Sequence, residues 1–452
     1  MFGDPSGNKG ESAESLKNKG NAAKREGNIA EAESFYRKAI NADPDYMPAY
    51  YNLGNVLQLQ GLYNEALGAY QAALNLAPDD YEIYVNTGVT LNAMNRFDEA
   101  IEAFSRAERL APDALEPTVN KGVALDRSGR YEEAIDALNQ AIKRDPACSI
   151  ARYYRSMSYL RLERWKEGFL EHEARLELPD TVPEDLLAGK QKWDGAPLDG
   201  RTLLIYPEQG MGDMIQFLRY VPLCKAAGAR VMVCCHPPLA PLLATASEID
   251  VVAPDGVPLP EPFDAYISVM SLAHVLGRHQ ELPPLRLDVP VETMPVIAQA
   301  KDLKVGVCWR GNPKQSRDSE RSIAGDEFWK HLAGMTGVSF FSLQIDDDNP
   351  NGLATPLAPY IDDFYDTANL VQQLDLVVTV CTSVAHLCGT LGIPTWVLLS
   401  FSPDWRWGVS GKLTPWYPSV RLFRQPSPGN WGAPLIEIRK AIESKTGAEE
   451  QP

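Results

Sequence analysis

Residues 47–80 read M-P-A-Y-Y-N-L-G-N-V-L-Q-L-Q-G-L-Y-N-E-A-L-G-A-Y-Q-A-A-L-N-L-A-P-D-D, and this stretch decides the fold of the first third of the chain. It is one copy of a pattern that recurs every 34 residues. The positions that recur four times are Gly20, Gly54, Gly88 and Gly122; Ala32, Ala66, Ala100 and Ala134; Tyr36, Tyr70, Phe104 and Leu138; Ala39, Ala73, Ala107 and Ala141; and Pro44, Pro78, Pro112 and Pro146. A period of this length predicts stacked helical units, because one unit cannot bury its apolar face alone.

Each recurring position has a packing reason. Small residues are expected where the two helices of a pair cross, and the aromatic or leucine is expected to fill the gap between successive pairs. Proline ends the second helix of each unit. Residues 13–148 resemble tetratricopeptide (TPR) repeats. We therefore predict a disordered stretch at 1–12 and a TPR array at 13–180, with four clear repeats and a degenerate fifth, Ser149–Pro179, that adapts the array to the next domain.

Asparagine occupies a further register of the repeat. It stands at Asn18, Asn52, Asn86 and Asn120, again 34 residues apart. Asparagine is a mediocre helix former, so its recurrence suggests a use for the side-chain amide. One interpretation is a ladder of amides that binds an extended peptide in the groove of the array. The other is that the amides bridge neighbouring helices, and the sequence does not decide between the two.

After Pro179, short apolar runs rich in Pro and Gly replace the helical pattern. Strands are predicted at 202–206, 230–235, 249–252, 265–269, 304–308, 338–343, 376–380 and 395–399. Helices are predicted at about 214–227, 326–333, 367–374 and 383–391. This alternation predicts parallel sheets covered by helices, in two Rossmann-like halves at 193–290 and 300–445. A cleft between the halves, at the carboxyl ends of the strands, is the expected ligand site.

The motif E-Q-G-M-G-D, residues 208–213, joins a predicted strand to a predicted helix. Gly210 and Gly212, beside Gln209, are expected to let the backbone turn tightly. Asp213 then lies at or near the helix N-terminus, on the edge of the cleft. A plain N-cap is the alternative interpretation of this aspartate.

The motif C-T-S-V-A-H, residues 381–386, follows a buried strand and opens a helix. The hydroxyls of Thr382 and Ser383, with free backbone N–H groups, suit a diphosphate. An ordinary helix cap is the alternative. His386 lies one turn further, and a lone histidine is more often structural than an acid or a base.

Two further motifs follow strands. V-G-V-C-W-R-G-N-P, residues 305–313, brings Arg310 to the end of its strand, where a cation could neutralise a diphosphate or form a surface salt bridge. P-D-W-R-W-G, residues 403–408, gathers aromatic residues that could stack on a base or sugar, or could cover the core.

These motifs, together with W-D-G-A-P-L-D-G-R-T-L-L-I at 193–205, S-L-Q at 342–344 and D-F-Y-D-T-A at 363–368, resemble bacterial TPR-linked glycosyltransferases related to heptosyltransferases (glycosyltransferase family 9), and more distantly O-GlcNAc transferases. The resemblance covers about residues 193–441. It implies an α + α/β chain in which a TPR α-solenoid precedes a GT-B-like pair of Rossmann-like domains. It further implies a donor held mainly by the C-terminal half, inversion at the anomeric carbon, and no required metal or other cofactor.

The resemblance also assigns roles by position. Asp213 matches the proposed general base toward the acceptor hydroxyl, and Thr382, Ser383 and Arg310 match the donor-phosphate region. The remaining residues of the predicted donor site are Asn312, Gln344, Cys381 and His386. The chain departs from the family at Cys381, where aspartate is usual. A thiol accepts hydrogen bonds less well than a carboxylate, so donor choice and activity stay open.

Composition narrows the function classes. The 452 residues include 43 Lys and Arg and 60 Asp and Glu, and a formal net charge of −17 disfavours general nucleic-acid binding. Seven cysteines without a C-x-x-C pair favour reduced thiols in the cytoplasm over disulfides or zinc. We expect no signal peptide and no membrane span. The acidic run Asp346–Asp348 is interpreted as a solvated loop and not as a metal site.

Three functions are compatible with these features. The leading one is a glycosyltransferase that moves a sugar from a nucleotide-diphosphate donor to an acceptor, such as a protein or peptide, selected by the TPR array. The second is a non-catalytic TPR scaffold with a degenerate sugar-nucleotide domain, which Cys381 supports. The third is a GT-B-like epimerase, for which the array has no purpose. The donor, the acceptor and the oligomeric state are left open.

Overall fold

The computed structural model describes residues 11–179, 187–208, 210–277, 282–315, 317–345 and 352–447. The chain divides into two compact units between Ser158 and Tyr159, and each unit is described by itself. Gln209 and the acidic run at 346–348, both singled out in the sequence, lie outside the described residues, as does most of the stretch 1–12.

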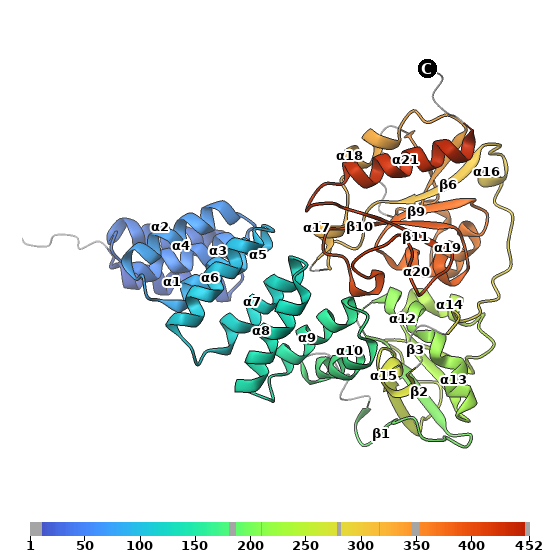
Figure 1. Ribbon diagram of the computed structural model, residues 1–452, viewed down its shortest axis with the longest axis horizontal. Coiled ribbons are helices and arrows are strands. Elements are labelled where there is room, and N and C mark those ends of the chain that lie inside the picture. Colours follow the sequence, from blue (N-terminus) through green and yellow to red (C-terminus); the bar gives the residue numbers. More distant parts are fainter. Residues whose placement is uncertain are drawn as a thin grey trace, which may run out of the picture. The chain divides into compact units, whose positions relative to one another are not determined.

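The first unit is a solenoid of helix pairs (Figure 1). Its four pairs are α1 (Ala13–Arg25) with α2 (Ile29–Ala42), α3 (Met47–Leu59) with α4 (Tyr63–Leu76), α5 (Tyr81–Ala93) with α6 (Phe97–Leu110), and α7 (Leu115–Arg127) with α8 (Tyr131–Arg144). Helix α9 (Ser149–Arg161) begins a fifth pair and runs into the second unit, where α10 (Trp165–His172) and the 3-10 turn η1 (Glu173–Glu177) follow. The predicted helical solenoid is confirmed.

The recurring glycines and aromatic residues pack on each other inside one helix pair. A Cβ atom added to Gly20 would lie 2.5 Å from Tyr36 Cε1, and one added to Gly54 would lie 2.4 Å from Tyr70 Cε1. Both tyrosines are fully buried. The expected contact with the next pair is also present, because Tyr70 shares a hydrogen bond with Thr90 of α5. In addition, the side chain closes the gap within its own pair, where only glycine leaves room for the ring.

The second unit contains two parallel sheets (Figure 1). The first sheet has the order β1-β5-β2-β3-β4, with β1 (Gln191–Lys192), β2 (Thr202–Tyr206), β3 (Arg230–Cys235), β4 (Val251–Pro254) and β5 (Ala265–Ser268). The second has the order β11-β10-β9-β6-β7-β8, with β6 (Leu303–Cys308), β7 (Val338–Ser342), β8 (Thr355–Pro356), β9 (Leu376–Val380), β10 (Thr395–Leu399) and β11 (Val420–Arg424). These sheets agree with the predicted α/β class.

Helices join the strands and cover the sheets. In the first half they are α12 (Met211–Phe217), α13 (Val221–Ala226), α14 (Ala240–Leu243) and α15 (Ser271–Leu276). In the second half they are α16 (Pro295–Ala298), α17 (Asp318–Arg321), α18 (Gly325–Leu332), α19 (Phe364–Val371), α20 (Ser383–Thr390) and α21 (Gly432–Thr446). The predicted helix at 214–227 differs most. It begins earlier, at Met211, and is interrupted by the 3-10 turn η2 (Leu218–Tyr220) before α13, where Pro222 lacks the N–H that a continuous helix needs.

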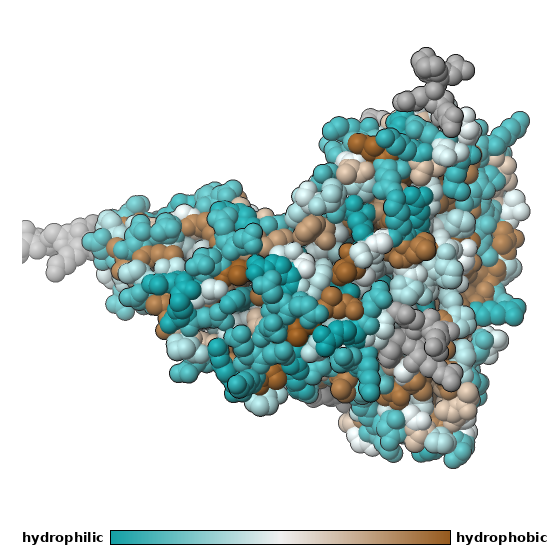
Figure 2. All heavy atoms as spheres, viewed as in Figure 1, coloured by the Kyte–Doolittle hydropathy of each residue, from teal (hydrophilic) through white to brown (hydrophobic). Residues whose placement is uncertain are grey.

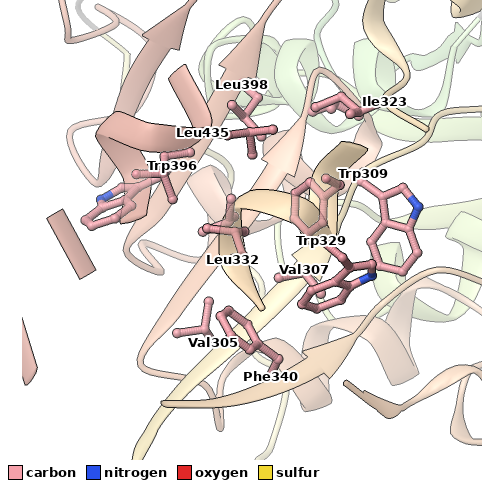
Figure 3. Close-up of a cluster of buried hydrophobic side chains, with 14 of the residues drawn as sticks. Val305, Val307, Trp309, Ile323, Trp329, Leu332, Phe340, Trp396, Leu398 and Leu435 are labelled. Atoms are coloured by element: carbon pink, nitrogen blue, oxygen red, sulfur yellow. The ribbon is translucent and has the colours of Figure 1, made fainter. Parts of the chain in front are cut away.

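The second sheet has apolar side chains on both faces. On one face, Val305, Val307 and Leu398 meet Trp329 of α18 and Leu435 of α21 (Figure 3). A separate cluster on the sheet includes residues of α19 and α20. Strands β9 and β10 are buried at every residue, because helices cover both faces of the sheet.

Helix α10 is packed into the second unit by aromatic side chains. The ring centroids of Trp165 and Trp416 lie 5.3 Å apart, and those of Phe169 and Trp405 lie 5.6 Å apart. Phe169 also lies 6.1 Å from Phe217, the last residue of α12. Because Phe217 belongs to the first half and Trp405 and Trp416 to the second, this aromatic cluster joins α10 to both halves.

The surface is predominantly polar on the side that Figure 2 shows, with hydrophobic residues dispersed among hydrophilic ones. Across the described ranges, no helix has the length and apolar character that crossing a membrane requires.

Candidate functional site

The strand order of the second sheet predicts where a ligand would bind. Numbered along the chain from β6, its strands run six-five-four-one-two-three, the order of a doubly wound Rossmann sheet. In such sheets the chain leaves the first strand and the fourth in opposite directions, and ligands bind outside the carboxyl ends of these two neighbours. Here they are β6, which ends at Cys308, and β9, which ends at Val380. The predicted donor residues follow both ends.

At the end of β6, polar contacts shape the loop that carries Arg310. The side chain of Gln344 brackets this residue: its Oε1 accepts from Arg310 N at 3.2 Å, and its Nε2 donates to Arg310 O at 3.4 Å. Asn312 is exposed, and its Oδ1 accepts from Lys314 N at 3.0 Å in a local turn. In this structure Gln344 and Asn312 therefore hold the loop, while the Arg310 side chain is half-buried.

At the end of β9, helix α20 begins without a side-chain cap. Thr382 is the N-cap residue, but its hydroxyl lies 3.1 Å from that of Thr379 and does not cap the helix. Among the described residues, none accepts a hydrogen bond from the backbone N–H groups of Ser383 and Val384. Unsatisfied N–H groups at a helix N-terminus attract anions. Helix α20 therefore does not begin with an ordinary side-chain cap at Thr382, which was the alternative interpretation of this motif.

Cys381, at the position where the resembling family carries aspartate, is half-buried. Its Sγ accepts from Trp407 Nε1 at 3.0 Å, and its carbonyl accepts from an Arg321 guanidinium N–H at 3.0 Å. Burial raises the pKa of the Cys381 thiol to about 11, so the group is neutral near pH 7.

Asp213 lies in the first turn of α12 and faces an arginine of the second half. Its Oδ1 is 2.5 Å from a terminal nitrogen of Arg406, whose other terminal nitrogen lies 2.8 Å from Asp404 Oδ1. Burial raises the pKa of the Asp213 carboxyl, while Arg406 opposes this change. Burial would also raise the pKa of Asp404, but Arg406 outweighs it and lowers that pKa to about 2.

Arg406 was not predicted from the sequence, which left two interpretations of the neighbouring tryptophans open. Trp405 and Trp407 are each 1% exposed and pack in the interior, which favours the core-covering interpretation of this motif over base or sugar stacking. The overlooked signal was a charged residue between two buried tryptophans, since a buried arginine needs a carboxylate partner.

His386 is structural in this arrangement. Its Nδ1 lies 3.0 Å from Tyr417 Oη, and its ring stacks on Trp407 with centroids 5.1 Å apart. Burial lowers the pKa of His386 to about 3, so the imidazole is neutral near pH 7. This matches the structural interpretation that the sequence already favoured for a lone histidine.

The two glycines of the E-Q-G-M-G-D motif do not act as predicted. Gly210 is extended, with φ −127°, and Gly212 lies inside α12, so neither needs a left-handed backbone. Their small size matters instead. A Cβ on Gly212 would lie 2.8 Å from His386 Cδ2, and one on Gly210 would lie 3.0 Å from Asp213 Oδ2. The motif lets α12 approach α20 closely.

The switch point of the first sheet, between β2 and β5, is filled by an ion pair. Glu208 follows β2 and receives two hydrogen bonds of 2.6 Å from Arg175. It also accepts from the Ser268 hydroxyl, at the end of β5, and from Met270 N at 3.3 Å. Neither Arg175 nor a role for Glu208 was predicted from the sequence, because nothing in the local pattern connects them.

The asparagine register is used in two ways. Asn86 Nδ2 donates to Tyr51 Oη at 2.8 Å and so bridges α5 to α3, while Asn52 Nδ2 donates to Pro48 O at 2.7 Å. Within the part of the chain that the structure describes, no residue hydrogen-bonds to the side chains of Asn18 and Asn120. Bridging between helices therefore accounts for Asn86, and a bond within its own helix accounts for Asn52.

The described residues hold no group of three or more His, Cys, Asp and Glu side chains placed to bind a metal ion. All seven cysteines are free thiols, six of them buried or half-buried in the second unit.

Comparisons with known proteins identify tetratricopeptide repeats in this chain. Models of the tetratricopeptide repeat match residues 45–113 and 119–181, and a model of the TPR repeat matches residues 20–61. Protein FlbA of Caulobacter vibrioides is 26% identical over 332 residues, which cover 65% of this chain and 55% of FlbA. The chain thus spans about half the length of this curated relative.

Two solved structures match part of the chain. YrrB, a TPR protein with an unusual peptide-binding site, is 24% identical and covers 37% of this chain and 87% of its own, with a TM-score of 0.32. MamA from Desulfovibrio magneticus RS-1 is 19% identical over 38% of this chain and 93% of its own, with a TM-score of 0.33. With the family matches and the helix pairs described above, the N-terminal region of this chain is a solenoid of tetratricopeptide repeats.

Proposed function

We propose that the protein is a glycosyltransferase that takes its sugar from a nucleotide-diphosphate donor and its acceptor from the TPR array. TPR repeats indicate a protein-interaction role, which makes a protein or peptide acceptor the natural partner. The observation that carries the proposal is the start of α20, which lies at the switch point of a doubly wound sheet and has no side-chain cap. A diphosphate supplies the negative charge that such an N-terminus attracts.

Arg310 adds a cation to this proposed donor site. It follows β6, the strand next to β9, and neighbouring strands lie about 5 Å apart. Its guanidinium can form two hydrogen bonds to phosphate oxygens. The helix N-terminus and Arg310 together would stabilise the charge that builds on the leaving diphosphate.

Asp213 would act as the general base. In the proposed reaction the acceptor hydroxyl gives its proton to the Asp213 carboxylate, and its oxygen bonds to the anomeric carbon on the face opposite the diphosphate. The bond from that carbon to the phosphate oxygen breaks, and its electron pair leaves with the diphosphate. The raised pKa of Asp213 strengthens it as a base, while the ion pair with Arg406 favours its charged form.

Two observations favour a second candidate function, the non-catalytic scaffold. The Asp213 carboxylate is already engaged by Arg406 at 2.5 Å, and Cys381 replaces the aspartate usual in the resembling family. If Asp213 and Cys381 serve only to stabilise the fold, the domain would not catalyse transfer, whether or not it binds a sugar nucleotide.

A binding screen tests the donor site. Because all nine tryptophans lie between residues 165 and 431, their fluorescence follows the unfolding of the second unit alone. A nucleotide-diphosphate sugar present at about 100 times its Kd should add about 2.7 kcal/mol of stability and raise the melting temperature. Ser383→Glu should abolish this rise by placing a negative charge at the helix start. Ser427→Glu, in an exposed loop, is the control and should keep it.

Turnover separates the candidate functions. Sugar transfer is supported if the wild type releases nucleoside diphosphate and Asp213→Asn abolishes this release while still binding the donor. Asparagine has the shape of aspartate but cannot act as the general base. Binding without release for every donor and acceptor supports the scaffold, and conversion of the free donor supports an epimerase. If no nucleotide sugar binds at all, the proposed donor site is wrong.

Cys381→Asp examines the departure from the family. If Cys381 faces the donor sugar, the new carboxylate should change donor affinity or choice. An unchanged donor profile would mean that this residue serves only its contact with Trp407.

A further inference from the structure

The Arg175 guanidinium is fully engaged at the switch point of the first sheet. Its Nε and one terminal nitrogen each lie 2.6 Å from a carboxylate oxygen of Glu208. The same terminal nitrogen contacts the hydroxyls of Ser268 at 3.2 Å and Ser271 at 3.0 Å. The other terminal nitrogen of Arg175 lies 2.9 Å from His172 O and 3.0 Å from Glu173 Oε1. Both Arg175 and Glu208 have almost no exposed side-chain surface, at 6% and 3%.

Arg175 does not belong to the sheet that it stabilises. It lies in η1, directly after α10, the second helix of the degenerate fifth repeat. Helix α10 is held by the aromatic cluster of Trp165 and Phe169 with Phe217, Trp405 and Trp416. The guanidinium is therefore placed by the end of the repeat array, and it reaches the loop that follows β2.

That loop leads to the proposed base. Glu208 precedes Asp213 by five residues, and Asp213 is held in turn by Arg406. Between the two carboxylates, Gly210 and Gly212 pack so closely that added Cβ atoms would meet Asp213 Oδ2 and His386. Glu208, which follows β2, and Asp213, in α12, are thus each held by an arginine from outside the first half, and they lie five residues apart in the chain.

We infer that Arg175 is a positioning residue through which the last repeat of the array sets the place of Asp213. This inference rests on the proposed function, because the position of Asp213 matters only if it meets an acceptor. A displacement of about 1 Å can cost on the order of a hundredfold in rate when reacting groups must align. A planar bidentate pair resists such a displacement better than a single contact.

The double variant Arg175→Met/Glu208→Gln tests the inference in the full-length protein. It replaces the ion pair by neutral side chains of similar size and leaves no unpaired buried charge. The matched control is Arg230→Met/Glu261→Gln, which removes an exposed bidentate arginine–glutamate pair of 2.9 and 3.2 Å from the same half of the molecule. Arg175→Lys is a milder second variant, because it keeps the positive charge but cannot form the planar pair of hydrogen bonds that the guanidinium makes with Glu208.

Two readouts are measured on each variant. Hydrogen exchange of the α12 amides, residues 211–217, should speed up about tenfold or more in the double variant and change little in the control, with β9 and β10 unchanged in both. The kcat for diphosphate release should fall about tenfold or more, while KM for the sugar nucleotide changes less than about threefold, because the donor site lies in the other half. Arg175→Lys should act in the same direction, more weakly.

The outcomes are distinguishable from failure of the proposed function. Unchanged α12 exchange in the folded double variant overturns the positioning role, as does unchanged kcat. If exchange is faster throughout the second unit of the double variant, Arg175→Lys decides: faster exchange confined to α12 supports the positioning role, and unchanged or uniformly faster exchange overturns it. A wild-type protein without turnover refutes the glycosyltransferase proposal, while the exchange experiment still decides whether Arg175 holds α12.

Discussion

His386 should make the second unit lose stability as the pH falls from 7 to 5. The imidazole is 5% exposed, bonds Tyr417 and stacks on Trp407. Its pKa in the folded protein is about 3, against 6.5 for an unperturbed histidine, because burial disfavours the charged ring.

The sign and size of the effect follow from this difference. The folded-state pKa is lower than the unfolded one, so below pH 6.5 the unfolded chain takes up a proton that the folded chain does not. The stabilising contribution is complete above pH 6.5 and is lost progressively down to about pH 3. At pH 5 the loss relative to pH 7 is about 2 kcal/mol.

The assay compares two proteins by urea unfolding, followed by tryptophan fluorescence at pH 7, 6 and 5. His386→Asn keeps a polar group near the position of Nδ1 and removes the titration. The free energy of unfolding should fall by about 2 kcal/mol less in this variant than in the wild type. His172, whose pKa burial also lowers, and Asp213, whose raised pKa acts in the opposite direction, contribute to both proteins and cancel in the comparison.

Equal pH dependence in the wild type and His386→Asn would refute this reasoning. Asp404 does not affect the comparison between pH 7 and pH 5. Its pKa of about 2 lies below the unfolded value of 3.8, so its contribution to stability is lost only as the pH falls below about 4. The control is Ser427→Asn, a change in an exposed loop, which should leave the pH dependence unchanged.

Two further predictions concern packing and charge. Gly54→Ala should destabilise the TPR array by about 1–3 kcal/mol, because the added methyl group meets the buried ring of Tyr70; thermal unfolding by circular dichroism measures it. Arg406→Ala should destabilise the second unit by about 3–5 kcal/mol in urea unfolding followed by fluorescence, because Asp213 and a second carboxylate lose their common buried partner.

Both predictions have matched controls. Gly68, on α4, has nothing within 4 Å of an added Cβ, so Gly68→Ala should stabilise the array by up to about 1 kcal/mol. A destabilised Gly68→Ala protein, or an unaffected Gly54→Ala protein, would contradict the packing argument. Arg286, in an exposed pair with Asp288, should tolerate replacement by alanine, and a loss as large as that of Arg406→Ala would contradict the role of burial.

The parts of the fold that could be predicted are those with a local cause. A 34-residue period carried by glycine, alanine and proline predicted every helix pair of the array, since each residue acts within its own unit. Strands such as β9 were predicted because both faces are covered and the run is apolar throughout. Strand β11 was missed because Arg421 and Arg424 interrupt its apolar pattern. Helix α21 was missed although Leu435, Ile438 and Ile442 have helical spacing.

The parts of the site that could not be predicted depend on distant partners. Arg406 meets Asp213 across 193 residues, and no local pattern pairs them. The roles of Gly210 and Gly212 were misread for the same reason, since their neighbours, not their own backbone angles, require glycine. The strand-to-helix transition before α20 was predicted because it is contained in one short motif, while anion binding there stays a prediction.

The most direct measurement is a crystal structure of the protein with a nucleoside diphosphate, tried in turn as the uridine, adenosine and guanosine compounds. The proposed function predicts the diphosphate at the start of α20, with oxygens about 3 Å from the backbone nitrogens of Ser383 and Val384 and within reach of Arg310. A diphosphate bound elsewhere, or a structure in which side chains fill this position and no nucleotide is present, would contradict it.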